Sequence, residues 1–431
     1  LSGTLGPWTW STSSSRALPE NGITINSEPF TKETLLQQAK IVSDGSQTMV
    51  VWVHGEELAY AVYNGIEWKA KLLTFDGYPK SNPTLVKMDD KWMVIWTQMD
   101  DGENMESLRL YYSIYDGNGW TIPQRVTSDD LPEGYPEAVY LDGKVYLVYL
   151  RDPDRDLSTK DWELWYAVYD GEKWSTPNML SSITPVVSPS IAKVGDTIYV
   201  AFISDYDGDF DTAENQELWV TDIQGNHVLL VSDKIVRDVT VHGYNGMAKV
   251  AWVEITGDGE AIYSLKVADI ANGEATNVKV IKESESQISQ PEFTIDDGKL
   301  RLFWITNEGG SDGDIDSAVL ENDTWVRDLE QRDDVELWSI DFTSDGSKWY
   351  GVISEPYLKG VHVISEGEHF YITAEDVPTL KEPERYTPPT VEEEGEVSIA
   401  TILLGIPLGV TIGLIGIAVQ LRGVRKIEIV E

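Results

Sequence analysis

The sequence of 431 residues contains no cysteine. This excludes disulfide bonds, thiolate metal sites and a cysteine nucleophile. Cysteine usage therefore does not indicate whether the protein works in an oxidising or a reducing compartment. Basic residues are also scarce, because 33 Lys and Arg stand against 73 Asp and Glu, a net charge of −40. A surface of this charge repels phosphate backbones and anionic lipid headgroups, so we expect no nucleic-acid binding. The chain is nevertheless 41% hydrophobic, enough to build a large core.

Familiar catalytic motifs are missing as well. The sequence has no His-Glu-x-x-His, no Gly-x-Ser-x-Gly and no phosphate-binding Walker loop. The histidines, which show no metal-ligand spacing, are His54, His227, His242, His362 and His369. Arginines that fall in or beside different predicted strands without a shared motif are Arg109, Arg237, Arg301 and Arg327. We interpret the histidines as packing or surface residues and these arginines as members of surface ion pairs, which favours a protein that is not an enzyme.

One long hydrophobic run lies near the C-terminus. Residues 397–421 contain no charged side chain, and at ~1.5 Å per residue a helix of this length spans a ~30 Å hydrocarbon layer. We therefore predict a transmembrane α-helix here. Within it, Gly405 and Gly409 form a G-x-x-x-G pattern that would let a second membrane helix approach closely.

The charges flanking this run predict its orientation. Three basic residues lie in the tail that follows, residues 422–431, whereas residues 391–396 carry four Glu. The positive-inside rule places the tail in the cytoplasm and the rest outside, as a single-pass protein of the cell membrane with an extracellular ectodomain. We expect that an export signal has been removed. Residues 375–396, rich in Pro and Glu, predict an extended strut. Such an anchor fits an archaeal envelope at least as well as a bacterial one.

Residues 38–374 repeat with a period of about fifty. Strongly apolar segments recur at residues 49–52, 93–96, 146–149, 199–202, 249–252, 301–304 and 350–353. Their alternation and their β-branched and aromatic content predict strands, and periods of this size are typical of repeat architectures. The segments therefore predict seven similar units, each a small sheet.

Each unit is expected to contain four strands, which we name a, b, c and d in chain order. In the clearest unit the predicted strands are residues 136–140, 144–150, 163–169 and 174–180. The predicted a–b turns are Asp44-Gly45, Asp89-Asp90, Asp142-Gly143, Gly195-Asp196, Asn245-Gly246, Asp297-Gly298 and Asp345-Gly346. These residue types accept the positive φ of tight hairpins. Four-stranded units in radial array form a β-propeller, so we predict an all-β, seven-bladed propeller over residues 38–374. Six or eight blades are the alternatives, and a strand at residues 22–29 in the segment 1–37 is expected to close the ring.

Two c–d segments carry a family resemblance. Tyr169-Asp-Gly-Glu-Lys-Trp-Ser-Thr-Pro177 and Tyr115-Asp-Gly-Asn-Gly-Trp-Thr-Ile-Pro123 resemble the repeats of sialidase-type propellers, also known as bacterial neuraminidase repeats. The Ser-x-Asp-x-Gly-x-Thr-Trp box of that family does not occur intact, so the resemblance implies the fold rather than an activity. The repeated Trp and Tyr at equivalent positions are expected to pack between blades.

Acidic residues gather in the predicted b–c loops, which share one face of the propeller. Loops with Asp at alternate positions supply the oxygen ligands that Ca²⁺ prefers. The predicted calcium ligands are Asp205, Asp207, Asp209 and Asp211; Asp312, Asp314 and Asp316; and Asp152, Asp154 and Asp156. A solvated acidic surface is the alternative interpretation. In a c–d turn, Asn322-Asp-Thr matches the acceptor pattern for N-glycosylation.

Three functions agree with these features. The first is a non-enzymatic, membrane-anchored propeller that binds or assembles with other envelope proteins or glycans, aided by divalent cations at the acidic loops. The second is a sialidase-like glycan-processing enzyme. The third is an accessory ectodomain subunit of a larger membrane complex. The propeller fold alone does not choose among them.

Overall fold

The computed structural model describes residues 39–373 except residue 103 and residues 156–160, 208–215, 258–260, 272, 308–312, 333–338, 355–359 and 366–367. Within these residues the chain forms seven antiparallel sheets of four strands each. Every sheet is built from four consecutive strands, and each strand pairs with the next in chain order. The sheets are therefore the seven predicted blades.

The first four blades have the following strand bounds. Blade 1 contains β1 (Ala39–Ser43), β2 (Thr48–His54), β3 (Glu57–Tyr63) and β4 (Trp68–Leu72). Blade 2 contains β5 (Lys80–Met88), β6 (Lys91–Met99), the 3-10 helix η2 (Met105–Ser107), β7 (Leu108–Tyr115) and β8 (Gln124–Arg125). Blade 3 contains β9 (Glu133–Leu141), β10 (Lys144–Arg151), β11 (Glu163–Tyr169) and β12 (Asn178–Met179). Blade 4 contains β13 (Val186–Val194), β14 (Thr197–Asp205), β15 (Gln216–Asp222) and β16 (His227–Ser232).

The remaining three blades follow the same plan. Blade 5 contains β17 (Ile235–Tyr244), β18 (Met247–Thr256), β19 (Ile262–Ala271) and β20 (Glu274–Ser284). Blade 6 contains β21 (Gln287–Asp296), β22 (Lys299–Asn307), β23 (Asp314–Glu321) and β24 (Thr324–Arg332). Blade 7 contains β25 (Ser339–Ser344), β26 (Trp349–Ser354), β27 (Gly360–Ser365) and β28 (Glu368–Thr373).

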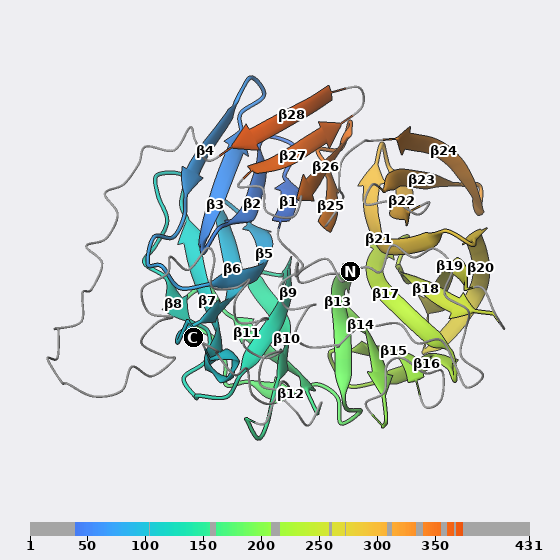
Figure 1. Ribbon diagram of the computed structural model, residues 1–431, viewed down its shortest axis with the longest axis horizontal. Helices are drawn as coiled ribbons and strands as arrows, with labels where there is room; N and C mark the ends of the chain where they lie inside the picture. Colours follow the sequence, from blue (N-terminus) through green and yellow to red (C-terminus); the bar gives the residue numbers. More distant parts are fainter. Residues whose placement is uncertain are drawn as a thin grey trace, which may run out of the picture. The chain divides into compact units, whose positions relative to one another are not determined.

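The blades stand around a central axis, with the first strand of each blade innermost (Figure 1). Blade 7 lies beside blade 1, and β25 contacts β1, so the ring closes. The prediction of a seven-bladed propeller is confirmed. Blade 7 takes all four strands from residues 339–373. The expected closing strand at residues 22–29 lies outside the described residues.

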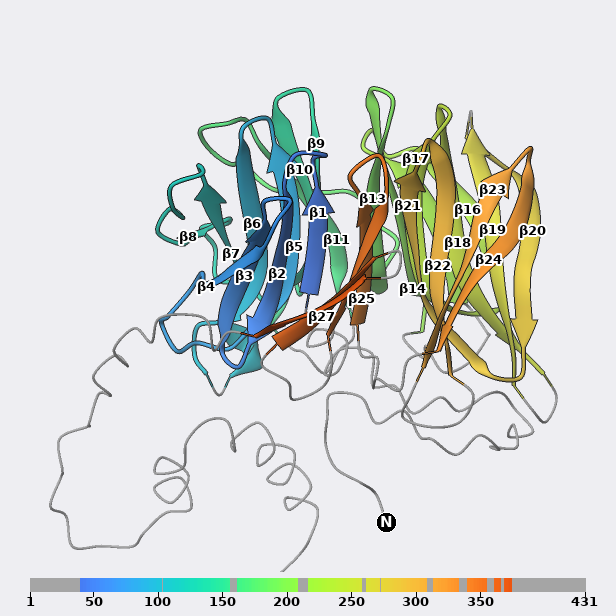
Figure 2. The same cartoon turned by 90° about the horizontal axis from the view of Figure 1, so that it is seen from above.

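The strands run between two faces of the propeller (Figure 2). Because neighbouring strands are antiparallel, the a–b and c–d turns lie on one face, which we call the hairpin face. The b–c loops and d–a connections lie on the other, the loop face. Within the described residues no helix is long and apolar enough to cross a membrane. The strut at residues 375–396, the predicted transmembrane helix at 397–421 and the tail at 422–431 lie outside them.

The a–b turns fold as their residue types predict. Asp142 and Gly143 have φ of +50° and +76°, and Asn245 and Gly246 have φ of +51° and +73°. Glycine and Asn adopt this left-handed backbone at little cost, so two residues suffice to reverse the chain between strands a and b. All seven predicted a–b turns connect antiparallel strands in the structure.

A β-bulge in the innermost strand repeats through blades 2 to 6 and was not foreseen. The register with strand b shifts once in each of these blades. The bulged residues with positive φ are Asn82, Tyr135, Ser188, Asp238 and Gln290. In four of the five blades a proline follows, and because it has no N–H to contribute to the ladder, it fits a bulge on an edge strand.

The outermost strand of blade 3 is shorter than predicted. Residues 174–180 were expected to form strand d, but β12 covers only Asn178–Met179, with an isolated bridge between Tyr169 and Trp174. Pro177 interrupts the ladder because it lacks an N–H. The Ser175 hydroxyl accepts the N–H of Val168 at 3.0 Å and so replaces one ladder bond.

The repeated aromatic residues pack between blades, as predicted. Trp120 of blade 2 contacts Tyr60 of blade 1 edge-on, with ring centroids 5.3 Å apart and planes at 79°. Trp174 of blade 3 meets Tyr112 of blade 2 in the same way, at 5.6 Å and 80°. Edge-to-face contacts of this kind add to the burial of apolar area. The c–d tryptophans therefore hold neighbouring blades together.

Candidate functional site

Three carboxylates converge on the loop face of blade 3. Asp152, Asp154 and Asp161 each offer a carboxylate oxygen, and these oxygens lie within 4.8 Å of one another. Asp152 follows the end of β10, and its N–H donates to the carbonyl of Pro132 at 3.0 Å, which ties this end of the loop to the blade 2–blade 3 connection. Asp161 directly precedes Trp162, which is fully buried.

Asp152 is the buried member of this cluster. Its side chain is 0% exposed, and Oδ1 accepts the N–H groups of Asp154 at 3.0 Å and Arg155 at 2.8 Å. Oδ2 is buried and has no hydrogen-bond partner among the described residues. Burial, together with the charges of Asp161 and Asp154, raises the pKa of the Asp152 carboxyl. A buried carboxylate oxygen without a partner is costly, and a bound cation would relieve that cost.

The predicted calcium ligands are only partly brought together. Asp152 and Asp154 meet as expected, Asp156 lies outside the described residues, and Asp161 was missed. Asp161 lies at the end of the b–c loop, just before β11, whereas the predicted ligands lie at its beginning, just after β10. Alternate spacing along the sequence cannot relate residues at the two ends of a loop. An acidic residue just before a buried Trp was the available signal.

The blade 4 loop begins in the same way. Asp205 is 0% exposed, and its Oδ1 accepts the N–H of Asp207 at 3.2 Å. This repeats the local geometry of Asp152 and Asp154 in the next blade. Asp209 and Asp211, the other two predicted ligands of this loop, lie outside the described residues.

The third predicted calcium group has a different setting. Asp314 and Asp316 lie within β23 rather than in a loop, and Asp312 lies outside the described residues. The Asp316 carboxylate pairs with Arg327 at 3.0 Å and accepts the Thr306 hydroxyl at 2.8 Å. The expected loop placement is therefore wrong for these two residues, because the ladder between β22 and β23 begins at Asp314. The predicted glycosylation acceptor Asn322 occupies an exposed turn between β23 and β24.

The innermost strands of the ring carry a cluster of charged side chains that contact one another. Lys40 of β1 lies 3.3 Å from Glu137 of β9 and 3.6 Å from Asp341 of β25. Burial opposes the charge on Lys40, but the carboxylates of Asp341 and Glu137 outweigh it and raise the pKa of Lys40. Burial raises the pKa of Glu292 to about 8, although the charge of Lys40 acts in the opposite direction. One ammonium group thus links innermost strands of blades 1, 3 and 7.

A second buried cluster fastens the connection between blades 2 and 3. Arg151 donates to Glu133 at 2.6 Å and to Asp129 at 2.9 Å, and the Thr127 hydroxyl donates to Glu133 at 2.6 Å. Glu133 is 0% exposed and burial raises its pKa, which Thr127 and Arg151 partly offset. Because both side chains are buried, the Arg151–Glu133 pair stabilises the connection between the blades and is closed to a substrate.

The arginines singled out in the sequence do not form a cluster. Arg301 and Arg327 make ion pairs with Asp328 and Asp316, as predicted. Arg109 instead donates to the backbone carbonyls of Glu106, Leu108 and Asp130. Arg237 donates to the carbonyl of Val236 at 2.8 Å and to the side-chain oxygen of Gln216 at 3.4 Å. Arg301 and Arg327 share blade 6 but pair with different carboxylates, so the four guanidinium groups do not converge on one site.

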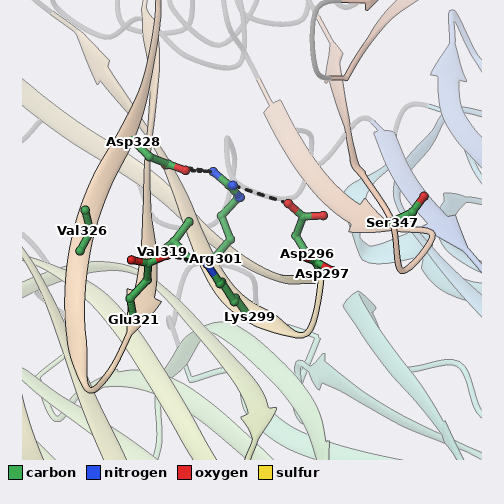
Figure 3. A pocket seen from close by; sticks show the side chains of 9 residues that line it. All are labelled: Asp296, Asp297, Lys299, Arg301, Val319, Glu321, Val326, Asp328 and Ser347. Atoms are coloured by element: carbon green, nitrogen blue, oxygen red, sulfur yellow. Dashed lines mark hydrogen bonds and ion pairs between the residues drawn. The ribbon is translucent and has the colours of Figure 1, made fainter.

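A pocket of about 310 Å³ opens on the hairpin face of blade 6 (Figure 3). Arg301 lies on its floor, between Asp328 and Asp296. The lining residues are Asp296, Asp297, Lys299, Arg301, Val319, Glu321, Val326, Asp328 and, from the a–b turn of blade 7, Ser347. No spacing in the sequence predicts it, because its walls come from four strands and a turn of the next blade.

The fold is similar to that of several solved structures, among them a polysaccharide lyase and a peptidase. No protein-family model and no curated protein matches the chain. A polysaccharide lyase, the ulvan lyase of family PL25, aligns with 84% of this chain and 99% of its own, at a TM-score of 0.56 and 14% identity. A puromycin-hydrolysing peptidase from Mycobacterium tuberculosis aligns with 85% of this chain and 57% of its own, at a TM-score of 0.50 and 12% identity. A Trypanosoma rangeli sialidase in complex with sialic acid aligns less well. The alignment covers 78% of this chain and 58% of the sialidase, at a TM-score of 0.43 and 12% identity.

These similarities concern the fold. The resemblance to sialidase-type propellers is confirmed at that level by the seven four-stranded blades themselves, and the polysaccharide lyase shares the fold at a TM-score of 0.56. Identities of 12–14% carry no activity across.

Proposed function

We propose that this chain is a membrane-anchored, cell-surface binding propeller that assembles with other envelope components through its loop face, with calcium held by Asp152, Asp154 and Asp161. The observation that carries the proposal is the convergence of these three carboxylates around the buried, unbonded Oδ2 of Asp152. Residues 397–421 supply the anchor, with residues 375–396 as the strut and Gly405 and Gly409 available to a partner helix.

The geometry of the three carboxylates suits Ca²⁺. The ion takes six to eight oxygens at about 2.3–2.6 Å, so two of its ligands lie up to about 5 Å apart. The oxygens of this site lie within 4.8 Å of one another. Loop carbonyls and water would complete the shell, and ligands bound from the solvent side would link the propeller to a partner.

The charge distribution supports binding over sialidase-like catalysis. Recognition of a carboxylated substrate needs arginines that point together, whereas Arg151, Arg301 and Arg327 are each paired with carboxylates of the propeller itself. Lys40 of the innermost strand β1 is paired in the same way.

Thermal unfolding of the detergent-solubilised full chain tests the calcium site. Calcium at one hundred times its Kd should stabilise the wild type by about 2.7 kcal/mol over the chelator-treated protein. In Asp152→Asn the amide oxygen still accepts the loop N–H groups, so the variant should fold yet show no calcium response. Terbium bound at the site of the wild type should luminesce when Trp162 is excited, and this luminescence should be lost in Asp152→Asn. Glu172→Gln, an exposed carboxylate on the hairpin face of the same blade, is the matched control. A full calcium response in Asp152→Asn would refute the site.

Extraction in mild detergent, followed by mass analysis, tests the assembly. Other envelope proteins should accompany the chain in calcium and be released by chelator. A fixed, chelator-resistant stoichiometry would favour the accessory-subunit alternative, and a monomer under both conditions would contradict the assembly.

A further inference from the structure

The pocket on the hairpin face is a second candidate site, on the opposite face from the carboxylate cluster and independent of it. Its volume of about 310 Å³ is at the small end of the range for ligand pockets, enough for one compact ligand. Its walls combine strands of blade 6 with the Ser347 turn of blade 7 (Figure 3).

The polar groups of the pocket are held in place by one another. Arg301 donates to both carboxylate oxygens of Asp328, at 2.9 and 2.7 Å, and to the Ser317 hydroxyl at 3.1 Å. Its Nε is buried without a hydrogen-bond partner among the described residues. Lys299 pairs with Glu321 at 2.5 Å. Arg301, Asp328 and Ser317 are therefore held in a fixed arrangement, and such preorganisation lowers the entropy cost of binding.

The charge of the pocket restricts the ligand. Four carboxylates and two basic groups line it, which gives 2 − 4 = −2. Asp297 makes no ion pair within the described part of the chain and lies on an exposed turn with φ of +48°. An anionic ligand would meet net repulsion. The net charge attracts a cationic ligand, but Lys299 and Arg301 in the same wall repel it at short range. A neutral ligand whose groups both donate and accept hydrogen bonds would fit the basic and the acidic groups alike.

An apolar surface completes the pocket. Val319 and Val326 lie on the side formed by β23 and β24, and Val326 is 43% exposed. A polyhydroxylated ring has this dual character, since its hydroxyls each donate and accept while its C–H face is apolar. We propose that this pocket binds one neutral sugar residue of a glycan, with hydroxyls at Asp297 and Lys299 and the C–H face on Val326.

Saturation-transfer NMR and calorimetry on the detergent-solubilised full chain test this proposal. The probes are methyl glycosides of neutral hexoses and N-acetylhexosamines, with methyl glucuronide as the anionic comparison. At least one neutral glycoside should bind saturably, and the glucuronide should bind at least tenfold more weakly. Asp297→Asn keeps a residue that tolerates positive φ and should weaken binding about tenfold by removing a charged acceptor. Val326→Glu should abolish binding.

The matched control is Asp142→Asn, which makes the same change in the a–b turn of blade 3, where φ is +50°. It should leave sugar affinity unchanged. The proposal is overturned if no neutral glycoside binds at tens of millimolar, if the glucuronide binds as tightly, or if Asp297→Asn and Asp142→Asn behave alike. Because calcium binding is measured separately, each of these results leaves the loop-face site standing.

Discussion

Individual charged residues hold this acidic propeller together at a few points. Lys40 pairs with Glu137 and Asp341 of two other innermost strands, and Asp341 also accepts the N–H of Ile41 at 2.7 Å. That bond links β25 to β1 where the ring closes. The closure seen in the structure therefore relies on side chains of the innermost strands.

Replacing Lys40 with Met should strongly destabilise the protein. The variant leaves the carboxylates of Glu137 and Asp341 buried without a cation, and breaking a buried pair in this way costs about 3–5 kcal/mol. Urea unfolding followed by tryptophan fluorescence measures the change. Adding Glu137→Gln to Lys40→Met should recover part of the loss, since it removes one uncompensated charge. A loss below about 1 kcal/mol for Lys40→Met would show that Lys40 does not secure the ring.

At the scale of strands, residue types predicted the structure correctly where a single turn or the alternation of apolar and polar residues determines it. The a–b turns Asp142-Gly143 and Asn245-Gly246 were identified from residue type, because positive φ is a local requirement. The bulges before Pro83, Pro136, Pro189 and Pro291 went unrecognised, although X-Pro within an edge strand is a usable signal. The short β12 follows the same rule, because Pro177 lies inside the predicted strand at residues 174–180 and has no N–H for the ladder.

Packing between elements imposes a requirement at one glycine. A Cβ on Gly243 of β17 would lie 2.1 Å from the carbonyl oxygen of Lys193 in β13, so blades 4 and 5 must separate locally to admit any side chain. Gly243→Ala should lower the free energy of unfolding by about 1–3 kcal/mol, measured by urea titration. Gly119→Ala, where a Cβ meets nothing within 4 Å, should change it by less than about 0.5 kcal/mol. Equal effects of the two substitutions would argue against tight blade packing at Gly243.

At the scale of the whole molecule, the two faces of the propeller offer different chemistry. The loop face presents the Asp152 cluster, and the hairpin face presents the Arg301 pocket. A module with one site on each face would link two kinds of envelope component. The net charge of −40 opposes self-association of the propeller and favours cations as ligands.

The membrane anchor remains a prediction with a direct test. In detergent phase separation, the full chain should enter the detergent phase, and a variant that ends at residue 396 should enter the aqueous phase, because residues 397–421 carry the hydrophobic run. Both proteins should show the same calcium response if the propeller is unaffected. Aqueous partitioning of the full chain would contradict the anchor.

The sequence by itself determined the period, the seven blades, the four-strand plan and the a–b turns. These follow from hydrophobic alternation and turn chemistry, which act over a few residues and repeat along the chain. Only the tertiary structure decided that Asp161 joins Asp152, that Lys40 meets Glu137, and that Arg301 lies on the floor of a pocket. Such meetings depend on bulges, on the register between strands and on packing between blades, and these bring together residues whose separation in the chain carries no signal.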